Sequence, residues 1–486
     1  MLLISCILAS LVLVLLYLLL LHKDNISSIP LVSYRNLPIV GHLIPFLRDR
    51  RKFLIECHQR YGQCFTVKLL TQRITFVLSP SDWATVARNS SLYLPEHEFG
   101  IKVFNTGSSV IGFQQLNIEV HRYYTQYLKN RDRLQPVIVE FALNLRKLMM
   151  HERMGLKNSK NLSEWISTDL ITFSHRMLFE PSSLALFGEI NPLSIESDFR
   201  LFDQKIHYFN ALLPSWIYSF FFRRELQTRF RLNNSWFSKI HPLHESDFIK
   251  HRANLLLDHP EWYSAQEFGG NQTAMMWASL ANSTPALFWC LFYILRDTKA
   301  LESIKQEIDM YLPSFSLDDD LSISLVSEWT TTRLNSCVLL DSAINETLRL
   351  VATPMVLRKC LHATDIALKD GRVLHLKSND AVALFSAIAH RDGDLFPDPD
   401  KFMFDRFAQK NADTVLGFMP FGIGKNICPG RYLARYEIKT CVALVLRHME
   451  YKFIDMKTIP TEQKHRIGVG IAPPNEDVPI RYRYKS

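Results

Sequence analysis

The spacing of the hydrophobic positions changes twice along the chain. Up to roughly residue 130, short runs such as Phe65 to Leu69 and Arg73 to Leu78 predict strands that alternate with helices. From Leu134 to Arg349 the apolar positions follow a mostly helical period, and short strand-like runs return after Ala352. This layout predicts a mainly α fold with small β-sheets.

The first segment of the chain is apolar over almost its whole length. No charged side chain occurs from Met1 to Leu21, and a helix of about 20 residues can cross the ~30 Å core of a bilayer. A cleaved signal peptide and a buried core helix are the alternatives, but the basic n-region and the cleavage site of a signal peptide are missing. Basic residues downstream favour a cytosolic location for the rest of the chain. We therefore expect a transmembrane signal anchor at 1–22, a basic, proline-containing hinge at 23–52 and one large domain at 53–486.

Composition narrows the class of protein further. The chain has 486 residues, of which 47% are hydrophobic, so it can bury a large core, and no repeat or long linker divides it. The net charge of +8 includes no dense basic block, which argues against nucleic acid as a partner. The eight cysteines contain no C-x-x-C pair and lack the spacing of a disulfide framework or a zinc site. A reducing compartment is the simpler inference.

One glycine-rich loop carries the most specific chemistry of the chain. Residues 421–430 read Phe-Gly-Ile-Gly-Lys-Asn-Ile-Cys-Pro-Gly and lead into a predicted helix from Arg431 to Arg447. The three glycines allow positive φ angles and a close approach of the backbone to a flat ligand. A thiolate at Cys428 gains from the helix dipole and from free backbone N–H groups, and such a thiolate is a good axial ligand for haem iron. The alternative is a buried structural cysteine in a glycine turn.

This loop resembles the haem-binding loop of the cytochrome P450 family. The family's pattern F-x-x-G-x-x-x-C-x-G is matched at Phe421, Gly424, Cys428 and Gly430. The resemblance covers essentially the whole chain and implies the cytochrome P450 fold, with residues 53–486 as the haem-thiolate catalytic domain. It implies haem b as the cofactor, Cys428 as the axial ligand of the iron, and Phe421, Gly422 and Gly430 as further cofactor-binding residues.

Two further motifs of the family form a charged cluster. Glu346 and Arg349 make an E-x-x-R pair in a predicted helix from Leu339 to Leu350, and their i, i+3 spacing places them on one helix face. In the family this pair is buried and is joined by an arginine of a later loop, here Arg406. The resemblance therefore implies a structural cluster that supports the cysteine loop. A solvated surface pair is the alternative reading of the spacing alone.

Arg358 and His390 match positions from which the family contacts the haem propionates. A guanidinium suits a carboxylate because its N–H groups form a bidentate fork. For His390 the alternative is a loop histidine that caps local backbone. Asn426 replaces the arginine that is common before the cysteine, so the resemblance implies that one propionate contact is lost there.

The segment 276–285 narrows the resemblance to one group of the family. Most members have an acid and a threonine where dioxygen lies, whereas this chain has Ala281 and Asn282. An amide is a poor proton carrier, so water must do more of the proton delivery. Together with Trp277 and Ala278, the pattern resembles the sterol and oxysterol 7α-hydroxylases, the sterol 12α-hydroxylase and prostacyclin synthase. We expect Asn282 to be catalytic and Trp277 and Ala278 to line the substrate pocket, with a core aromatic as the alternative for Trp277.

Other segments resemble the same group or its microsomal relatives. Residues 402–407 and 477–483 resemble the group's F-x-Y-D-R-F motif and its C-terminal strand, and residues 213–219 resemble the 12α-hydroxylase. Residues 37–41 resemble the proline-containing hinge of microsomal members. The resemblance thus implies a single-pass enzyme of the endoplasmic reticulum membrane, anchored by 1–22, with its catalytic domain on the cytosolic face.

The resulting functional prediction is a mono-oxygenase that hydroxylates a sterol, an oxysterol or a similar lipid. It would use O2 and electrons from NADPH delivered by NADPH–cytochrome P450 reductase. Lys425, Arg431, Arg435 and Lys439 form a candidate docking patch for the electron donor, with solvated helix surface as the alternative. A second interpretation is an isomerase similar to prostacyclin synthase, which rearranges a lipid endoperoxide without added electrons. A haem-binding sensor or carrier is the third.

Overall fold

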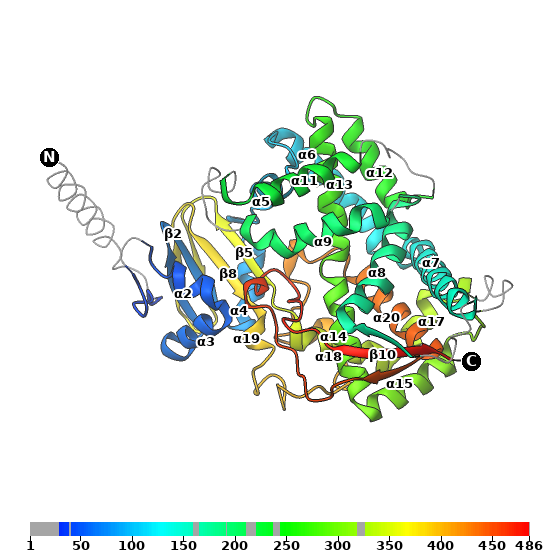
Figure 1. Cartoon of the computed structure of the whole chain (residues 1–486). Helices are drawn as coiled ribbons and strands as arrows, with labels where there is room; N and C mark the ends of the chain where they lie inside the picture. Colours follow the sequence, from blue (N-terminus) through cyan, green and yellow to red (C-terminus); the bar gives the residue numbers. More distant parts are fainter. Residues whose placement is uncertain are drawn as a thin grey trace, which may run out of the picture. The chain divides into compact units, whose positions relative to one another are not determined.

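The computed structural model (Figure 1) describes residues 29–37, 40–158, 165–190, 192–209, 220–236, 244–317 and 326–485. The chain divides into two compact units. The first contains the residues up to Pro95, Thr353–Pro399 and Gly422–Ile427, and the second contains Glu96–Ala352, Asp400–Phe421 and the chain from Cys428 onward. The predicted anchor at 1–22 and the segment 213–219 lie outside the described residues, as do positions 38 and 39 of the predicted hinge.

The first unit is built on a five-stranded sheet with the strand order β1-β2-β8-β5-β3. Its elements are α2 (Leu43–Arg48), α3 (Arg50–Tyr61), β1 (Cys64–Leu69), β2 (Gln72–Val77), α4 (Pro80–Arg88), β3 (Leu92–Tyr93), β5 (Met355–Cys360), β6 (Thr364–Ala367), β7 (Val373–Leu376), β8 (Ala381–Phe385), α19 (Ser386–Ala389) and the short 3₁₀ helix η5 (Gly424–Asn426). The strands β2 and β8 run parallel, and the other pairs of this sheet are antiparallel. The predicted strands around 65–69 and 73–78 are confirmed as β1 and β2. Residues 43–52 of the predicted hinge form α2 and the start of α3.

The second unit is mostly helical and carries a three-stranded sheet of order β4-β10-β9. Its elements are α5 (Glu96–Phe104), α6 (Val110–Tyr123), the π-helix η1 (Tyr124–Leu128), α7 (Arg131–Asn158), β4 (Ile166–Asp169), α8 (Leu170–Phe187), α9 (Pro192–Phe209), α11 (Arg223–Ser235), α12 (Asp247–Leu257), α13 (Ala265–Leu280), α14 (Ser283–Arg296), α15 (Thr298–Tyr311), α17 (Thr331–Ser336), α18 (Val338–Val351), η4 (Ala412–Thr414), α20 (Arg431–His448), β9 (Met449–Phe453), η6 (Lys464–Arg466) and β10 (Pro479–Tyr484). Helix α14 contacts α8, α18 and α20 and is buried along most of its length. The prediction of a mainly α fold with small sheets is confirmed.

The break between α13 and α14 follows from local sequence. Helix α13 starts with a capping box, in which the Ser264 hydroxyl accepts from Glu267 N and the Glu267 carboxylate accepts from Ser264 N. Its helical course ends at Leu280, and α14 starts at Ser283. Pro285 has no N–H and so cannot bond back to the turn at residues 281–282, which explains why the two helices are separated there. This turn is where the sequence predicts the oxygen-side residues.

Within the described ranges, one helical stretch is long and apolar enough to cross a membrane. It spans Ala265–Arg296, which is α13 and α14 together. Because 72% of its apolar window is buried inside the protein, it has the character of a core helix. It therefore adds little to the prediction of an anchor at 1–22.

Candidate functional site

Cys428 lies in the loop that leads into α20, and its backbone is held on both sides. Its N–H donates to the Phe421 carbonyl at 2.9 Å, and its own carbonyl accepts from Arg431 Nη1 at 3.1 Å. Gly430 is the N-cap of α20, so the half-buried thiol directly precedes the first helical turn. The loop therefore presents a thiol at a helix start, as the sequence predicts.

Two opposing effects act on the pKa of this thiol. Burial raises the pKa of the Cys428 thiol, although a hydrogen bond from the Gly430 backbone and the charge of Arg431 act in the opposite direction. The stabilising effect expected from the helix start is thus outweighed by desolvation. A metal ion reverses this balance because it deprotonates a coordinating thiol. Without a metal, burial disfavours a free nucleophilic thiolate at Cys428.

The glycines of the loop differ in backbone angle and in the space around them. Gly422 and Gly424 both have φ = 76°, in the left-handed region, and a Cβ on Gly424 would also lie 3.1 Å from Ala87 Cβ. Gly430 has φ = −80°, so it does not use the positive φ that glycine allows, and any residue can adopt its backbone angle. A Cβ there would meet no atom within 4 Å. Since neither backbone nor neighbours require this glycine, the open space beside it fits a flat group such as haem.

The other cysteines of the described chain are placed differently, and all are buried: Cys57 in α3, Cys64 in β1, Cys290 in α14, Cys337 at the N-cap of α18, Cys360 in β5 and Cys441 in α20. Burial raises the pKa of four of them, those at 57, 64, 290 and 337, to about 12. Among the residues that the structure describes, no group of three or more His, Cys, Asp or Glu side chains could hold a metal ion. Cys428 thus remains the candidate single protein ligand, and its role stays a prediction.

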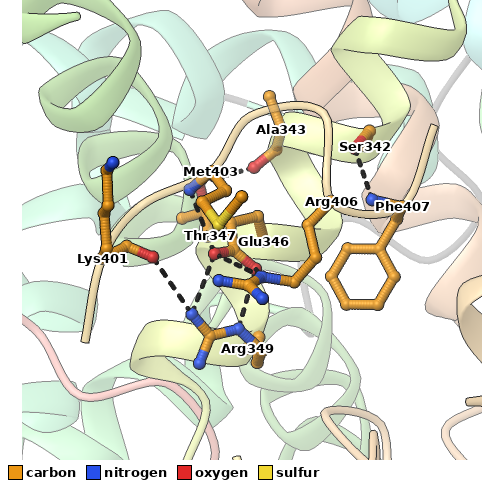
Figure 2. Close-up of polar contacts among 9 residues, drawn as sticks. All are labelled: Ser342, Ala343, Glu346, Thr347, Arg349, Lys401, Met403, Arg406 and Phe407. Carbon is orange, nitrogen blue, oxygen red and sulfur yellow. Dashed lines mark hydrogen bonds and ion pairs between the residues drawn. The ribbon is translucent and has the colours of Figure 1, made fainter. Parts of the chain in front are cut away.

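Glu346, Arg349 and Arg406 meet in the interior of the second unit. The Glu346 carboxylate accepts from Arg349 Nε at 2.7 Å and Nη2 at 2.8 Å, and from Arg406 Nε at 3.0 Å (Figure 2). It also accepts from Met403 N at 3.1 Å. The side chains of Glu346 and Arg349 are fully buried, and that of Arg406 is 10% exposed. The buried ion pairs implied by the resemblance are therefore confirmed, and the alternative of a solvated surface pair is wrong.

Asn282 lies in the turn between α13 and α14, where its side chain bonds to another segment of the second unit. Its Oδ1 accepts from the Ile471 N–H at 3.0 Å. Because a backbone N–H is only a donor, this bond fixes which end of the amide is oxygen and leaves Nδ2 pointing elsewhere. Gly470 has φ = +108°, and a Cβ there would lie 2.3 Å from Asn282 Oδ1. The loop at 470–471 can approach the amide this closely because it contains a glycine.

Trp277 lies on α13, and its side chain contacts other helices through both its ring and its indole N–H. Its indole ring lies 5.6 Å from the ring of Phe104 and 6.4 Å from that of Phe99, between centroids. Its Nε1 donates to Asp203 Oδ1 on α9 at 2.8 Å. Trp277 is half-buried and the neighbouring Ala278 is exposed, so neither residue is enclosed in the core. Their assignment to the substrate pocket remains a prediction.

A cavity of about 320 Å³ adjoins the same turn within the second unit. Ala281 and Thr284 line it from the helices, and Asp203 and Arg466 line it from α9 and η6. A space of this size with several polar walls holds water readily. Water therefore has room beside the position where the family pattern has an acid and this chain has Ala281.

Arg358 and His390 belong to the first unit and are both buried. Arg358 lies on β5, 3% exposed, and its Nη1 donates to the Leu357 carbonyl at 3.1 Å. His390 is 1% exposed at the C-cap of α19. Their predicted contacts with haem propionates are not tested by these positions and stay predictions.

Two members of the predicted basic docking patch have structural partners. Arg435 Nη2 pairs with Asp413 at 2.7 Å, and Lys439 Nζ pairs with Asp341 at 2.7 Å. The Lys439 side chain is only 3% exposed. Because both side chains are paired and largely buried, they stabilise the surroundings of α20 and contribute little charge to a docking surface.

The sequence gives no indication of several residues that the structure places around the predicted site. Asp203 and Arg466 are 263 residues apart in the sequence and pair with each other. Asp203 also accepts from Trp277 Nε1, and both residues line the cavity. The feature of the sequence that could have indicated this region is the glycine pair Gly468 and Gly470. Both have positive φ, and Gly470 lies close to the side chain of Asn282.

The fold and this site define a class of protein, and comparison with known proteins identifies it. The family profile described as Cytochrome P450 matches residues 32–480. The chain therefore belongs to the cytochrome P450 family, whose iron is held by a cysteine thiolate. It is an enzyme, a mono-oxygenase among the oxidoreductases.

Its relatives include several proteins that match along nearly their whole length. Cytochrome P450 7B1 of Mus musculus is 30% identical, with 93% of this chain and 90% of the relative covered. Cytochrome P450 7A1 of Oryctolagus cuniculus is 28% identical, with 92% of each chain covered. The 7-alpha-hydroxycholest-4-en-3-one 12-alpha-hydroxylase of Oryctolagus cuniculus is 28% identical, with 94% of this chain and 93% of the relative covered. These are proteins of the group that the turn at 276–285 resembles.

Proposed function

We propose that this protein is a microsomal haem-thiolate mono-oxygenase that hydroxylates a sterol, an oxysterol or a lipid of similar shape. The reaction consumes O2, two electrons and two protons, places one oxygen atom in a C–H bond of the lipid and releases the other as water. The observation that carries the substrate class is similarity to sterol-hydroxylating relatives over more than nine tenths of the chain.

The cofactor of this proposal is haem b, with Cys428 as the axial ligand. The fit rests on the half-buried thiol at the start of α20 and on the open space beside Gly430. Phe421 and Gly422 complete the cysteine loop, and Arg358 and His390 would bind the two propionates. When bound, haem supplies the activation of dioxygen, and the protein supplies the thiolate, the apolar pocket and the protons.

On the oxygen side we assign Asn282 a donor role. With Oδ1 occupied by Ile471 N, its two Nδ2 hydrogens have no partner among the residues described and remain for a ligand or for water. An amide neither ionises nor takes up a proton to any extent near neutral pH, so it is a poor proton carrier and proton delivery depends on water. The cavity beside Ala281 and Thr284 gives that water a place.

The proposal includes a membrane-bound setting. Residues 1–22 would anchor the chain in the endoplasmic reticulum, with residues 23–52 as the connecting segment and residues 53–486 as a cytosolic catalytic domain. NADPH–cytochrome P450 reductase would supply the electrons from the same membrane. An apolar substrate is then taken from the bilayer in which the enzyme is anchored.

The decisive experiment combines ligand binding with turnover. The oxidised, haem-loaded protein is titrated with sterols, oxysterols, fatty acids and endoperoxide analogues, and displacement of iron-bound water is followed in the Soret region. Lipids that bind are then supplied with reductase and NADPH. We expect sterols or oxysterols to bind most tightly and to give NADPH consumption that matches hydroxylated product. Binding of fatty acids alone would contradict the substrate class.

A second candidate function is isomerisation of a lipid endoperoxide. The observation that favours it is the turn itself, where Ala281 and Asn282 offer an amide donor and no proton-carrying side chain. Isomerisation is redox-neutral and needs neither reductase nor NADPH. Efficient conversion of an endoperoxide without reductase, together with no sterol-dependent NADPH consumption, would decide for this function.

A further inference from the structure

We propose that Asp203 is a positioning residue for substrate recognition, which fixes the indole of Trp277 in one orientation and so shapes an apolar wall of the pocket. The inference rests on the proposed function, since that function makes Trp277 part of the lipid pocket. It adds a residue to which no motif of the sequence points.

A single carboxylate joins three elements of the second unit. Asp203 Oδ1, on α9, accepts from Trp277 Nε1 of α13 at 2.8 Å and from Arg466 Nη1 of η6 at 3.0 Å. The same Arg466 nitrogen also donates to the Asp203 main-chain carbonyl at 2.8 Å. Arg466 is 1% exposed and the Asp203 side chain 19% exposed, so the pair is largely shielded from solvent. Shielding strengthens both the ion pair and the hydrogen bond to the indole.

The ring of Trp277 also packs against aromatic side chains of α5. Trp277 contacts Phe99 and Phe104 of α5, and Phe104 in turn lies 5.7 Å from Phe202 of α9, between ring centroids. Phe202 precedes Asp203 in the same helix, so one turn of α9 provides both an apolar and a polar contact to this cluster. A ring held by neighbours on one side and by a hydrogen bond on the other has one orientation available.

This arrangement determines which chemistry Trp277 offers to a ligand. The indole N–H is the only polar atom of the side chain, and Asp203 occupies it. What remains is aromatic surface, which suits the rigid apolar rings of a sterol. If the carboxylate were removed, the indole could turn, and its N–H would become available to oxygen atoms of other ligands. Asp203 therefore acts on the substrate through Trp277.

The first part of the test observes the indole directly and needs no substrate. The protein, which contains eight tryptophans, is labelled with 5-fluorotryptophan, and Trp277→Phe identifies the Trp277 line in the fluorine spectrum. We expect one narrow line in the unsubstituted protein and in Asp203→Asn, which keeps the acceptor. In Asp203→Leu the line should shift and broaden or split, while the other lines stay in place. An unchanged Trp277 line in Asp203→Leu would overturn the proposal.

The second part measures discrimination between ligands. The ratio of dissociation constants for a fatty acid and a sterol should fall about tenfold in Asp203→Leu and stay within about twofold in Asp203→Asn. In a Trp277→Phe background, Asp203→Leu should not change the ratio, because the residue through which Asp203 acts has lost its N–H. If the Trp277 fluorine line changed in Asp203→Leu while the ratio of dissociation constants did not, the orientation of the indole would not set specificity. That result too would overturn the proposal.

Folding and the proposed function are separated by two controls. Asp203→Leu leaves the buried Arg466 without its carboxylate, so the double variant Asp203→Leu/Arg466→Met, which removes both charges, provides the same readouts if the single variant does not fold. A protein that binds neither sterol nor fatty acid would refute the substrate class. The fluorine line would still decide whether Asp203 orients Trp277.

Discussion

Three carboxylates of the second unit, of which Glu346 and Glu437 are buried and Asp203 is partly exposed, differ in how many arginines they contact. Glu346 pairs with two, Arg349 and Arg406, and also accepts from a backbone N–H. Asp203 pairs with one, Arg466, and shares its oxygen with the indole of Trp277. Glu437 on α20 has no cationic partner in the described part of the chain and accepts only from the Ser182 hydroxyl, at 2.6 Å.

The difference separates a cluster that only stabilises the fold from one that also positions a side chain. Both guanidinium groups around Glu346 are directed at the same carboxylate, which leaves that site no alternative arrangement. At Asp203 the charge is partly solvated, and Arg466 Nε and Nη2 have no hydrogen-bond partner among the described residues. The bonds of Glu346 join charged groups and a backbone N–H and so stabilise the fold, whereas one bond of Asp203 holds a side chain, the indole of Trp277, in a fixed orientation. This contrast is why we assign a scaffold role to the first and a positioning role to the second.

The largest effect is expected at Glu346. Arg349→Ala should lower the free energy of unfolding by about 3–5 kcal/mol, because it leaves part of a fully buried carboxylate without its partner. Chemical denaturation monitors the loss, and the yield of haem-loaded protein should fall with it. The matched control is Arg333→Ala, whose partner Glu328 and own side chain are 48% and 46% exposed, and which should change stability by less than about 1 kcal/mol. Normal stability of Arg349→Ala with a loss of turnover alone would refute the scaffold role.

A smaller effect is expected at Asp203. Arg466→Gln should lower the free energy of unfolding by about 1–3 kcal/mol, since Asp203 keeps its bond to Trp277 and some access to water. Arg231→Gln is the control, because Arg231 of α11 pairs with Asp198, which lies on the same helix as Asp203, but Arg231 is 52% exposed. If Arg466→Gln cost as much as Arg349→Ala, the distinction between the two sites would fail.

The smallest effect concerns Glu437, which has no cation within the described residues. Burial raises the pKa of Glu437 from its ordinary value of 4.5 to about 7. The folded protein then binds a proton that the unfolded chain has released, so this group's contribution to stability is full below about pH 4.5 and is lost as the pH rises towards 7. Glu437→Gln should remove that dependence and stabilise the protein by about 1–2 kcal/mol at pH 8.

The pH dependence has its own control. Ser182→Ala removes the hydroxyl that lowers the pKa of Glu437, so the decline of stability between about pH 5 and 8 should become steeper. Denaturation curves at several pH values measure both variants. Identical pH profiles for the unsubstituted protein and Glu437→Gln would contradict a neutral buried carboxyl.

Contacts between residues close in sequence could be predicted, and contacts between distant segments could not. Glu346 and Arg349 share a helix face through their i, i+3 spacing, and the cysteine loop is recognisable because its glycines and its helix are contiguous. The α13–α14 region is recognisable from its apolar run, and Pro285 accounts for its break. Arg406 is placed only by the family motif.

The partners of the predicted site residues depend on the tertiary fold. Trp277 and Asp203 are 74 residues apart, and Asn282 and Ile471 are 189 apart, with no periodicity that relates them. Which of the loop glycines use positive φ could not be read from the sequence either: Gly422 and Gly424 do, and Gly430, with φ = −80°, does not. The sequence indicates the backbone donors near Cys428, but it does not reveal how strongly burial raises the pKa of this thiol.

The central claim is that Cys428 is the thiolate ligand of haem, and one spectrum tests it most directly. The reduced carbon monoxide complex of a haem-thiolate protein has a red-shifted Soret band that other axial ligands do not give. We expect the unsubstituted protein and Cys360→Ala to show this band and Cys428→Ala to lack it. A Cys428→Ala protein that kept the red-shifted band would contradict the account, because another cysteine would then hold the iron.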